Sequence, residues 1–305
     1  MNGKIGVIGS VMVDITIRVD FLPKAGQNIF AREVIHGLGG KGYNISVALT
    51  GLGSKVQFCS YVGNDIQTTE ILNNIKKAGI NVEDIAFSEY NTGIAYIISS
   101  SDAQNIIIGT PLSHITFSDM SKQIINTIKK TNILITTLEL PSECIKKIIE
   151  LSRYYNKKLI IDAGPIQNIT PEFFNGVFCV SPNKTELESI VNIELNTILD
   201  IEKAAKYLLD FGIENVIVKL GDKGCLVANK QESIIINAHK VNVIDTSAAG
   251  DSFMSGLVFS LHKGKCIIES AEFANKCGAI AVTKLGTSNS MPTMIDIDQF
   301  ENFLI

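Results

Sequence analysis

From about residue 130 onward, short apolar runs alternate with amphipathic stretches. The pattern predicts strands at 132–140, 157–165, 176–183 and 215–221, and helices at 141–155 and from 184 to about 211. These predicted strands are apolar on both faces, which is typical of strands buried in a parallel sheet. The alternation predicts an α/β fold with a doubly wound, mostly parallel central sheet flanked by helices.

The first third of the chain has a different pattern. GVIGSVMVDITIRVD (6–20) breaks at Gly9 and Ser10, QNIFAREVIHG (27–37) is a second extended run, and TGIAYIISSSDAQNIIIG (92–109) predicts a hairpin that turns at 101–104. We interpret these runs as a small β-sheet lid inserted into one domain that spans residues 1–305, with lid strands at approximately 11–19, 28–37 and 92–109. The alternative is that they are extra strands of the main sheet. One apolar face of the lid would cover a site, and the other would pair with a second subunit.

The segment VIDTSAAGDSFMSGLVFSL (243–261) carries the main candidate chemistry. A strand is predicted at 239–245, then a loop of small residues from Thr246 to Gly250, and then a helix that begins near Asp251. The free N–H groups at a helix N-terminus and a small-residue loop together form a cradle for anions. Asp251 beside that cradle would accept a proton from an attacking hydroxyl, which predicts phosphoryl transfer. The alternative is that Asp251 only caps the helix.

Two further segments suggest ligand contacts. HGLGGKGYNISVALTGLG (36–53) places glycines around Lys41, and a helix is predicted to follow through about Leu49. In this interpretation Lys41 and Asn44 donate hydrogen bonds to a polar ligand. The alternative is that the glycines form a plain turn. SPNKTELE (181–188) places Asn183 and Glu186 on one helical face, as either a Mg²⁺ shell or a capping box. Neither a Walker loop nor the G-x-G-x-x-G fingerprint is present, which disfavours a nicotinamide dehydrogenase.

Composition narrows the class of protein. The 305 residues carry a net charge of −4 and 46% hydrophobic residues, without runs of Lys or Arg, so we expect no nucleic-acid partner. The longest apolar runs are too short for a membrane span, and the first residues lack a signal peptide. Six dispersed cysteines without C-x-x-C predict buried thiols in a reducing cytoplasm rather than a zinc or disulfide framework.

Four motifs together resemble those of the ribokinase-like, PfkB-type carbohydrate kinases. GGKGYN (39–44), PNKTE (182–186), KLGDKG (219–224) and DTSAAGD (245–251) occur in the family's order and spacing. The resemblance runs from VIGSVMVD to AIAVTKLGTSNSMP, and ribokinases and deoxyribokinases are the most similar members. It implies ATP-dependent phosphorylation of a sugar or nucleoside hydroxyl, on a doubly wound sheet whose small β lid often forms a dimer clasp.

The resemblance also implies roles for individual residues. Asp251 matches the catalytic base, and Ala248, Ala249 and Gly250 match the anion hole. The matched sugar contacts are Asp14, Gly40, Lys41, Asn44 and Glu139. Asn183 and Glu186 match the Mg²⁺–phosphate group, Lys219 and Gly221 the nucleotide site, and Asn275 the adenine pocket. A K⁺ site is implied at the Asp245 carboxylate, the main-chain oxygens of Ser247, Ala281, Lys284 and Gly286, and the Ser290 hydroxyl; the alternative is an Asp245 that merely caps a turn.

Two departures from ribokinases concern the substrate. Met12 stands where ribokinases have Asn, as it does in deoxyribokinases, and Met cannot hydrogen-bond a sugar hydroxyl. A deoxypentose is therefore favoured, unless Met12 is only lid packing. Tyr43 would either stack on a ring-bearing substrate or fill the core. A phosphofructokinase-type enzyme would need basic residues for a substrate phosphate, and Arg18 and Arg32 are the only early arginines. A nucleoside kinase and a non-catalytic sugar sensor are the remaining alternatives.

Overall fold

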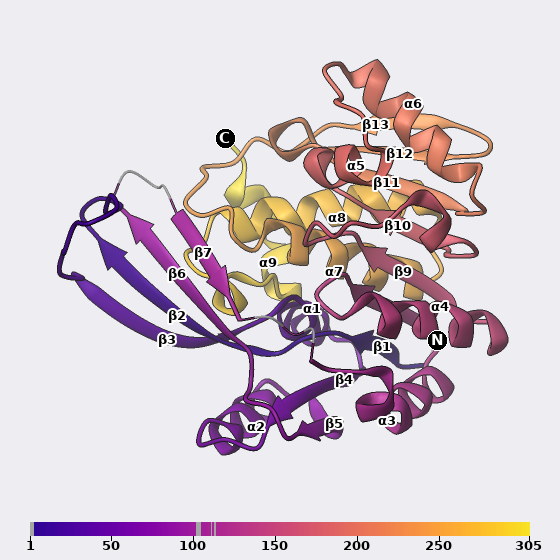
Figure 1. Cartoon of the computed structure of the whole chain (residues 1–305). Helices are drawn as coiled ribbons and strands as arrows, with labels where there is room; N and C mark the ends of the chain where they lie inside the picture. Colours follow the sequence, from indigo (N-terminus) through magenta and orange to yellow (C-terminus); the bar gives the residue numbers. More distant parts are fainter. Residues whose placement is uncertain (1–2, 102–104, 111, 113) are drawn as a thin grey trace.

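The fold is built around one large sheet with helices on both faces (Figure 1). The computed structural model describes residues 3–101, 105–110, 112 and 114–305. Within these residues the sheet order is β13-β12-β11-β10-β9-β8-β1-β4-β5, parallel except at β12 and β13. Its strands are β1 (Ile5–Ile8), β4 (Val56–Gly63), β5 (Asn81–Ser88), β8 (Ile133–Thr137), β9 (Lys158–Asp162), β10 (Cys179–Ser181), β11 (Asn215–Lys219), β12 (Cys225–Asn229) and β13 (Ser233–Ile236).

Helices cover both faces because the strands are apolar on both sides. On β8, Ile133 and Ile135 join the core beneath α1, α2, α7 and α8, whereas Leu134 joins the core beneath α3 to α6. The helices are α1 (Lys41–Gly51), α2 (Thr68–Lys77), α3 (Phe117–Lys130), α4 (Ser142–Tyr154), α5 (Lys184–Val191), α6 (Ile198–Leu209), α7 (Ala249–His262), α8 (Ile267–Val282) and α9 (Met294–Asp298). The predicted doubly wound α/β class is confirmed.

A separate four-stranded sheet projects from one side of the body (Figure 1). Its order is β3-β2-β6-β7, formed by β2 (Met12–Val19), β3 (Glu33–Gly39), β6 (Ile94–Ser100) and β7 (Asn105–Gly109). The small inserted sheet was therefore predicted correctly, and the alternative of extra strands in the main sheet is wrong. The second run begins later than expected, at residue 33 rather than 28, and positions 102–104 of the predicted turn lie outside the described residues.

One predicted strand is absent from the described chain. Residues 239–245 form only an isolated bridge, between Val241 and Leu304. The reason is that Ile244 and Asp245 donate their N–H groups to Val282 O, at 2.7 and 3.2 Å, so this backbone pairs with the end of α8. The side chains of Val243 and Ile244 are consequently exposed.

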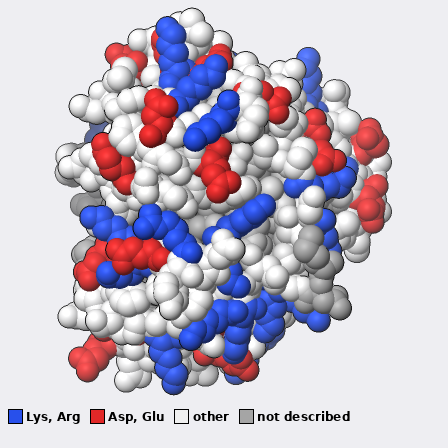
Figure 2. Space-filling model, turned by 90° about the vertical axis from the view of Figure 1, so that its right-hand side faces the viewer, with Lys and Arg blue, Asp and Glu red and all other residues white. Residues whose placement is uncertain are grey.

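The distribution of charged side chains and the state of the cysteines agree with the sequence analysis. On the face in Figure 2, basic and acidic side chains are interspersed. The six cysteines are free thiols, and five of them are buried. None of the described helices combines the length and the apolar character needed to cross a membrane.

Candidate active site

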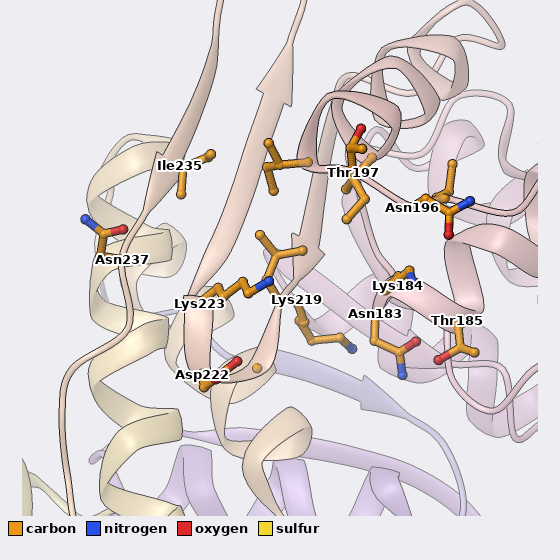
Figure 3. A pocket seen from close by; sticks show the side chains of 15 residues that line it. Asn183, Lys184, Thr185, Asn196, Thr197, Lys219, Asp222, Lys223, Ile235 and Asn237 are labelled. Carbon is orange, nitrogen blue, oxygen red and sulfur yellow. The ribbon is translucent and has the colours of Figure 1, made fainter.

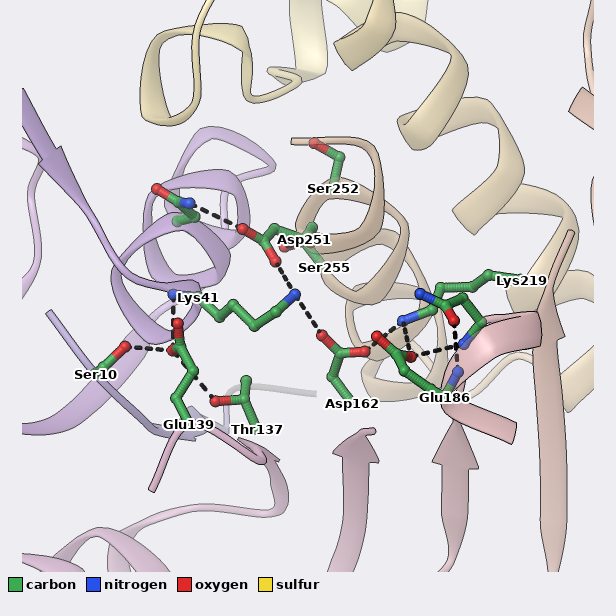
Figure 4. Close-up of polar contacts among 12 residues, drawn as sticks. Ser10, Lys41, Thr137, Glu139, Asp162, Glu186, Lys219, Asp251, Ser252 and Ser255 are labelled. Carbon is green, nitrogen blue, oxygen red and sulfur yellow. Dashed lines mark hydrogen bonds and ion pairs between the residues drawn. The ribbon is translucent and has the colours of Figure 1, made fainter. Parts of the chain in front are cut away.

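Asp251 lies in the first turn of α7 and is only 5% exposed. Its carboxylate accepts hydrogen bonds from Lys41 Nζ at 3.0 Å and from Asn44 Nδ2 at 2.8 Å (Figure 4). Both donors come from α1, which packs against α7. The glycine–lysine turn and the DTSAAGD segment, some 200 residues apart in sequence, therefore meet at one site.

The loop before α7 presents main-chain N–H groups at the helix N-terminus. Ala248 is the N-cap and has no side-chain capping bond, and the Ala249 N–H donates to Thr246 O at 3.2 Å. Among the described residues, the Gly250 and Asp251 N–H groups have no hydrogen-bond partner. A Cβ on Gly250 would meet nothing within 4 Å, so open space lies beside these donors. Of the predicted anion-hole groups, the Ala248 and Gly250 N–H groups are thus without a partner in the described part of the chain, and open space lies beside Gly250.

Glu139 lies just after β8 and faces the N-terminus of α1. It accepts hydrogen bonds from the Lys41 N–H at 3.0 Å and from Ser10 Oγ. Burial raises the pKa of Glu139 to about 7, although the Lys41 ammonium opposes this shift. Gly40 caps α1 with φ 86°, in the left-handed region that favours glycine, and a Cβ there would lie 2.7 Å from Ser10 Oγ.

Asp14 lies on β2, at the base of the small sheet, and is 9% exposed. Burial raises its pKa to about 6, although a hydrogen bond from Thr287 Oγ1 at 3.5 Å opposes the shift. Gly39 on β3 makes room for this carboxylate, because a Cβ on Gly39 would lie 2.0 Å from Asp14 Oδ2. Burial thus raises the pKa of Asp14 as well as that of Glu139.

A second hollow of about 670 Å³ opens beyond the carboxyl end of β11 (Figure 3). The predicted nucleotide residues Asn183, Lys219 and Gly221 line it. Asn275 does not line this hollow. Its Nδ2 donates a hydrogen bond to Ile236 O at 3.2 Å, and so it holds the backbone next to Asn237, which does line the hollow.

Asn183 and Glu186 form a capping box, which was one of the two interpretations of this segment in the sequence analysis. Asn183 Oδ1 accepts the Glu186 N–H at 2.8 Å, and Glu186 Oε2 accepts the Asn183 N–H at 2.7 Å. Glu186 Oε1 has no such partner in the described chain and faces Gly164, whose Cβ position lies 2.6 Å away. One oxygen of the Glu186 carboxylate therefore has no hydrogen-bond partner among the described residues.

The residues expected around K⁺ also lie together. Asp245 Oδ1 accepts the Ser247 N–H at 2.9 Å, and Asp245 Oδ2 accepts the Gly286 N–H at 3.0 Å. These contacts join the loop before α7 to the loop after α8, and Ser290 Oγ donates within the latter to Thr287 O at 2.8 Å. Carboxylate, hydroxyl and carbonyl oxygens are a suitable ligand set for a hard cation. No cluster of three His, Cys, Asp or Glu that could hold a metal occurs among the described residues.

Sequence reasoning missed Asp162, the central acid of the cleft. It ends β9, is fully buried, and pairs with Lys41 Nζ at 2.9 Å and with Lys219 Nζ (Figure 4). Burial would raise its pKa, but the two ammonium groups outweigh that effect and hold the pKa below its usual range. For Lys41, burial favours the neutral amine, yet Asp162, Asp251 and Glu139 hold its pKa well above the usual value. An acid directly after the apolar run LII (159–161) was the available signal.

Comparisons with known proteins show the family and the fold of the chain. The model of the pfkB family carbohydrate kinases matches residues 2–294. The chain is 32% identical to the ribokinase of Haemophilus influenzae (98% of this chain, 99% of the relative) and 30% identical to the deoxyribokinase of Salmonella typhi (98% of each). The structure of Arabidopsis thaliana ribokinase complexed with ribose and ATP superposes with a TM-score of 0.89 at 25% identity, covering 99% of this chain and 100% of that one.

Proposed function

Because the chain belongs to the pfkB family of carbohydrate kinases, it is an ATP-dependent sugar kinase, and we propose that its substrate is a pentose, with a deoxypentose favoured over ribose. The observation that carries the site assignment is the contact of Asp251, at the tip of α7, with Lys41 and Asn44 from the glycine-rich turn. An acid, a cation and free N–H groups in one cleft are the parts that phosphoryl transfer requires.

In the proposed mechanism the sugar lies between the main body and the small sheet. Asp14, Asn44 and Glu139 fix its hydroxyls, with Lys41 nearby. Sugar binding displaces Lys41 and Asn44 from the Asp251 carboxylate, which then accepts the proton of the attacking primary hydroxyl. The γ-phosphoryl group of ATP is transferred in line to that hydroxyl oxygen, and ADP leaves. Closure of the small sheet excludes water and limits wasteful ATP hydrolysis.

The N-terminus of α7 would stabilise the charge that develops on the transferring group. The unpaired Gly250 N–H and the open space beside it support this role for the loop 248–250. We place the nucleotide in the hollow lined by Lys219 and Gly221, with the Asn275 side chain holding the wall of that hollow.

Two cations would complete the site. Glu186, with Asn183 through water, would hold Mg²⁺, which supplies charge neutralisation to the ATP phosphates when bound. Asp245, Ser290 and the main-chain oxygens of residues 247, 281, 284 and 286 would hold K⁺. The Asp245–Gly286 contact supports this proposal, because a cation there would tie the loop after α8 to the loop before α7.

The proposed preference for a deoxypentose rests on Met12. Met12 is 8% exposed and precedes Asp14 by two positions on β2, so both side chains point to the same face. The side chains of Met12 and Leu112 both pack on Gly93, because a Cβ at that glycine would lie 2.9 Å from Leu112 Cδ2 and 3.2 Å from Met12 Cε. These residues form an apolar wall beside Asp14, and a sugar hydroxyl facing that wall would lose its hydrogen bonds to water.

The test is a coupled ADP-release assay over a panel of pentoses, hexoses and nucleosides. We expect 2-deoxyribose to have a higher kcat/KM than ribose, Met12→Asn to shift the ratio toward ribose, and Met12→Leu, which keeps the wall apolar, to retain it. A wild-type enzyme that uses ribose far better than deoxyribose would exclude the proposed preference.

The alternative substrates receive less support. Arg18 and Arg32 are paired with Glu33 and Asp20, which disfavours a dedicated site for a sugar phosphate. Tyr43 is 6% exposed and packs in the core, so its ring is not presented to a nucleoside base. A nucleoside kinase remains an outcome of the substrate panel.

We also propose a homodimer formed through the small sheet, in a cytoplasmic enzyme. Val34, Ile107 and Ile108 expose 51–61% of their surface there, which is a large apolar area for a free sheet. The particle mass in solution tests the dimer, with twice 33.1 kDa expected. The free thiols support a reducing compartment.

A further inference from the structure

Two lysines and three carboxylates form one continuous chain across the cleft (Figure 4). Lys41 Nζ lies 3.0 Å from Asp251 Oδ1 and 2.9 Å from Asp162 Oδ2. Lys219 Nζ contacts Asp162 Oδ1 and lies 3.9 Å from Glu186 Oε2. Asp162 therefore stands between the half of the cleft assigned to the sugar and the half assigned to the nucleotide.

Asp162 differs from the other two acids of this chain in two respects. It is fully buried, whereas Asp251 and Glu186 each keep a small exposed fraction. Its side-chain oxygens pair only with the two lysines among the described residues. The second partner of each lysine is an acid that the proposed reaction needs free: Asp251 for the proton and Glu186 for the metal.

We propose that Asp162 is a positioning residue that anchors Lys41 and Lys219 while each exchanges its second carboxylate partner for a ligand oxygen. The inference rests on the proposed function, because it assumes that sugar and ATP enter the two halves of the cleft. A lysine stem has several freely rotating bonds, so without a fixed buried anion each ammonium would occupy many positions. The anchor keeps both cations in the cleft before and after the ligands bind.

Asp84 provides a matched comparison. It is also a buried acid, 2% exposed, but it accepts hydrogen bonds from the neutral side chains of Gln57, Asn126 and Thr127 and lies outside the cleft. A buried acid with neutral partners stabilises the fold, whereas one held by two active-site lysines positions those lysines. Asp84→Asn should lower the melting temperature and leave kcat and both KM values of the folded enzyme unchanged.

The experiment is a mutant cycle with Asp162→Asn, Lys41→Met and Lys219→Met, in which turnover and thermal stability are measured for every combination. In the wild-type background we expect Asp162→Asn to lower kcat by about 10- to 100-fold, the usual effect of misplacing a catalytic group by about 1 Å. In the double variant that lacks Lys41 and Lys219, Asp162→Asn should change kcat less than about threefold, because the effects of residues that act through one another are not additive. An equal loss in every background, or tighter MgATP binding with turnover retained, would refute the positioning role.

Thermal stability gives a second readout that needs no substrate. Asp162→Asn removes the anion that the two partly buried ammonium groups share and leaves each with one carboxylate partner, so it should destabilise the fold. Removing both lysines as well should restore most of the lost melting temperature. A triple variant as unstable as Asp162→Asn alone would overturn the inference. A wild-type chain that phosphorylates no compound of the panel would instead overturn the proposed function, so the two failures are distinguishable.

Discussion

Substituting Gly39 by alanine should disable the sugar site by displacing Asp14, without replacing any side chain of that site. The new Cβ would lie 2.0 Å from Asp14 Oδ2, 2.3 Å from Oδ1 and 2.3 Å from Cγ, whereas ordinary contact begins at 3.4 Å. The overlap with Oδ2 is thus about 1.4 Å (3.4 − 2.0). Because Cγ is also in the way, rotation of the carboxylate about its own axis does not relieve the clash, and the whole group must move.

A displacement of about 1 Å in a positioning group costs about 100-fold in rate, or about 2.7 kcal/mol of transition-state stabilisation. The assay is ADP release at varied sugar concentration, in which we expect kcat/KM for the sugar to fall by this factor while KM for ATP changes little. Gly37→Ala is the matched control, because Gly37 is two residues away on β3 and a Cβ there meets nothing within 4 Å. If Gly39→Ala kept the wild-type kcat/KM, the assignment of Asp14 to the sugar site would be wrong.

Three further predictions concern the base, the pH dependence and the monovalent cation. Asp251→Asn should lower kcat by about 10²- to 10⁴-fold in the coupled assay, as loss of a general base does, with sugar binding retained in calorimetry; unchanged turnover would remove Asp251 from that role. The pKa values of Asp14, about 6, and Glu139, about 7, lie above their usual values, so both acids gain charge as pH rises through this range. Hydroxyl hydrogen bonds to an ionised carboxylate are stronger than those to the neutral acid, so kcat/KM for the sugar should increase from pH 5.5 to 8, and Glu139→Gln should abolish the step near pH 7; a flat wild-type profile would contradict this reasoning. Replacing Na⁺ by K⁺ should raise the turnover of the wild-type enzyme and not that of Asp245→Ala, and equal rates in both salts would argue against the cation site.

Local sequence patterns predicted several elements that the structure contains. The apolar runs near 133, 158 and 215 are strands, since residues that are apolar on both sides are stable only between two layers of helices. The prediction failed at 239–245, where Val241 and Val243 alternate with polar residues as in a strand. Whether such a segment forms a strand depends on a neighbouring edge, and here the backbone pairs with Val282 at the end of α8 instead.

The sequence by itself determined the class of fold, the small sheet, and the motifs that identify the kinase family, because each depends on residue type and short spacing. Only the tertiary structure decided how the charges are paired. Asp162 lies 121 residues from Lys41 and 57 residues from Lys219, and their contact depends on strand order and helix packing rather than on any local pattern. The capping box of Asn183 and the burial of Tyr43 were likewise open in the sequence, since one residue type serves either role and only the surrounding atoms select between them.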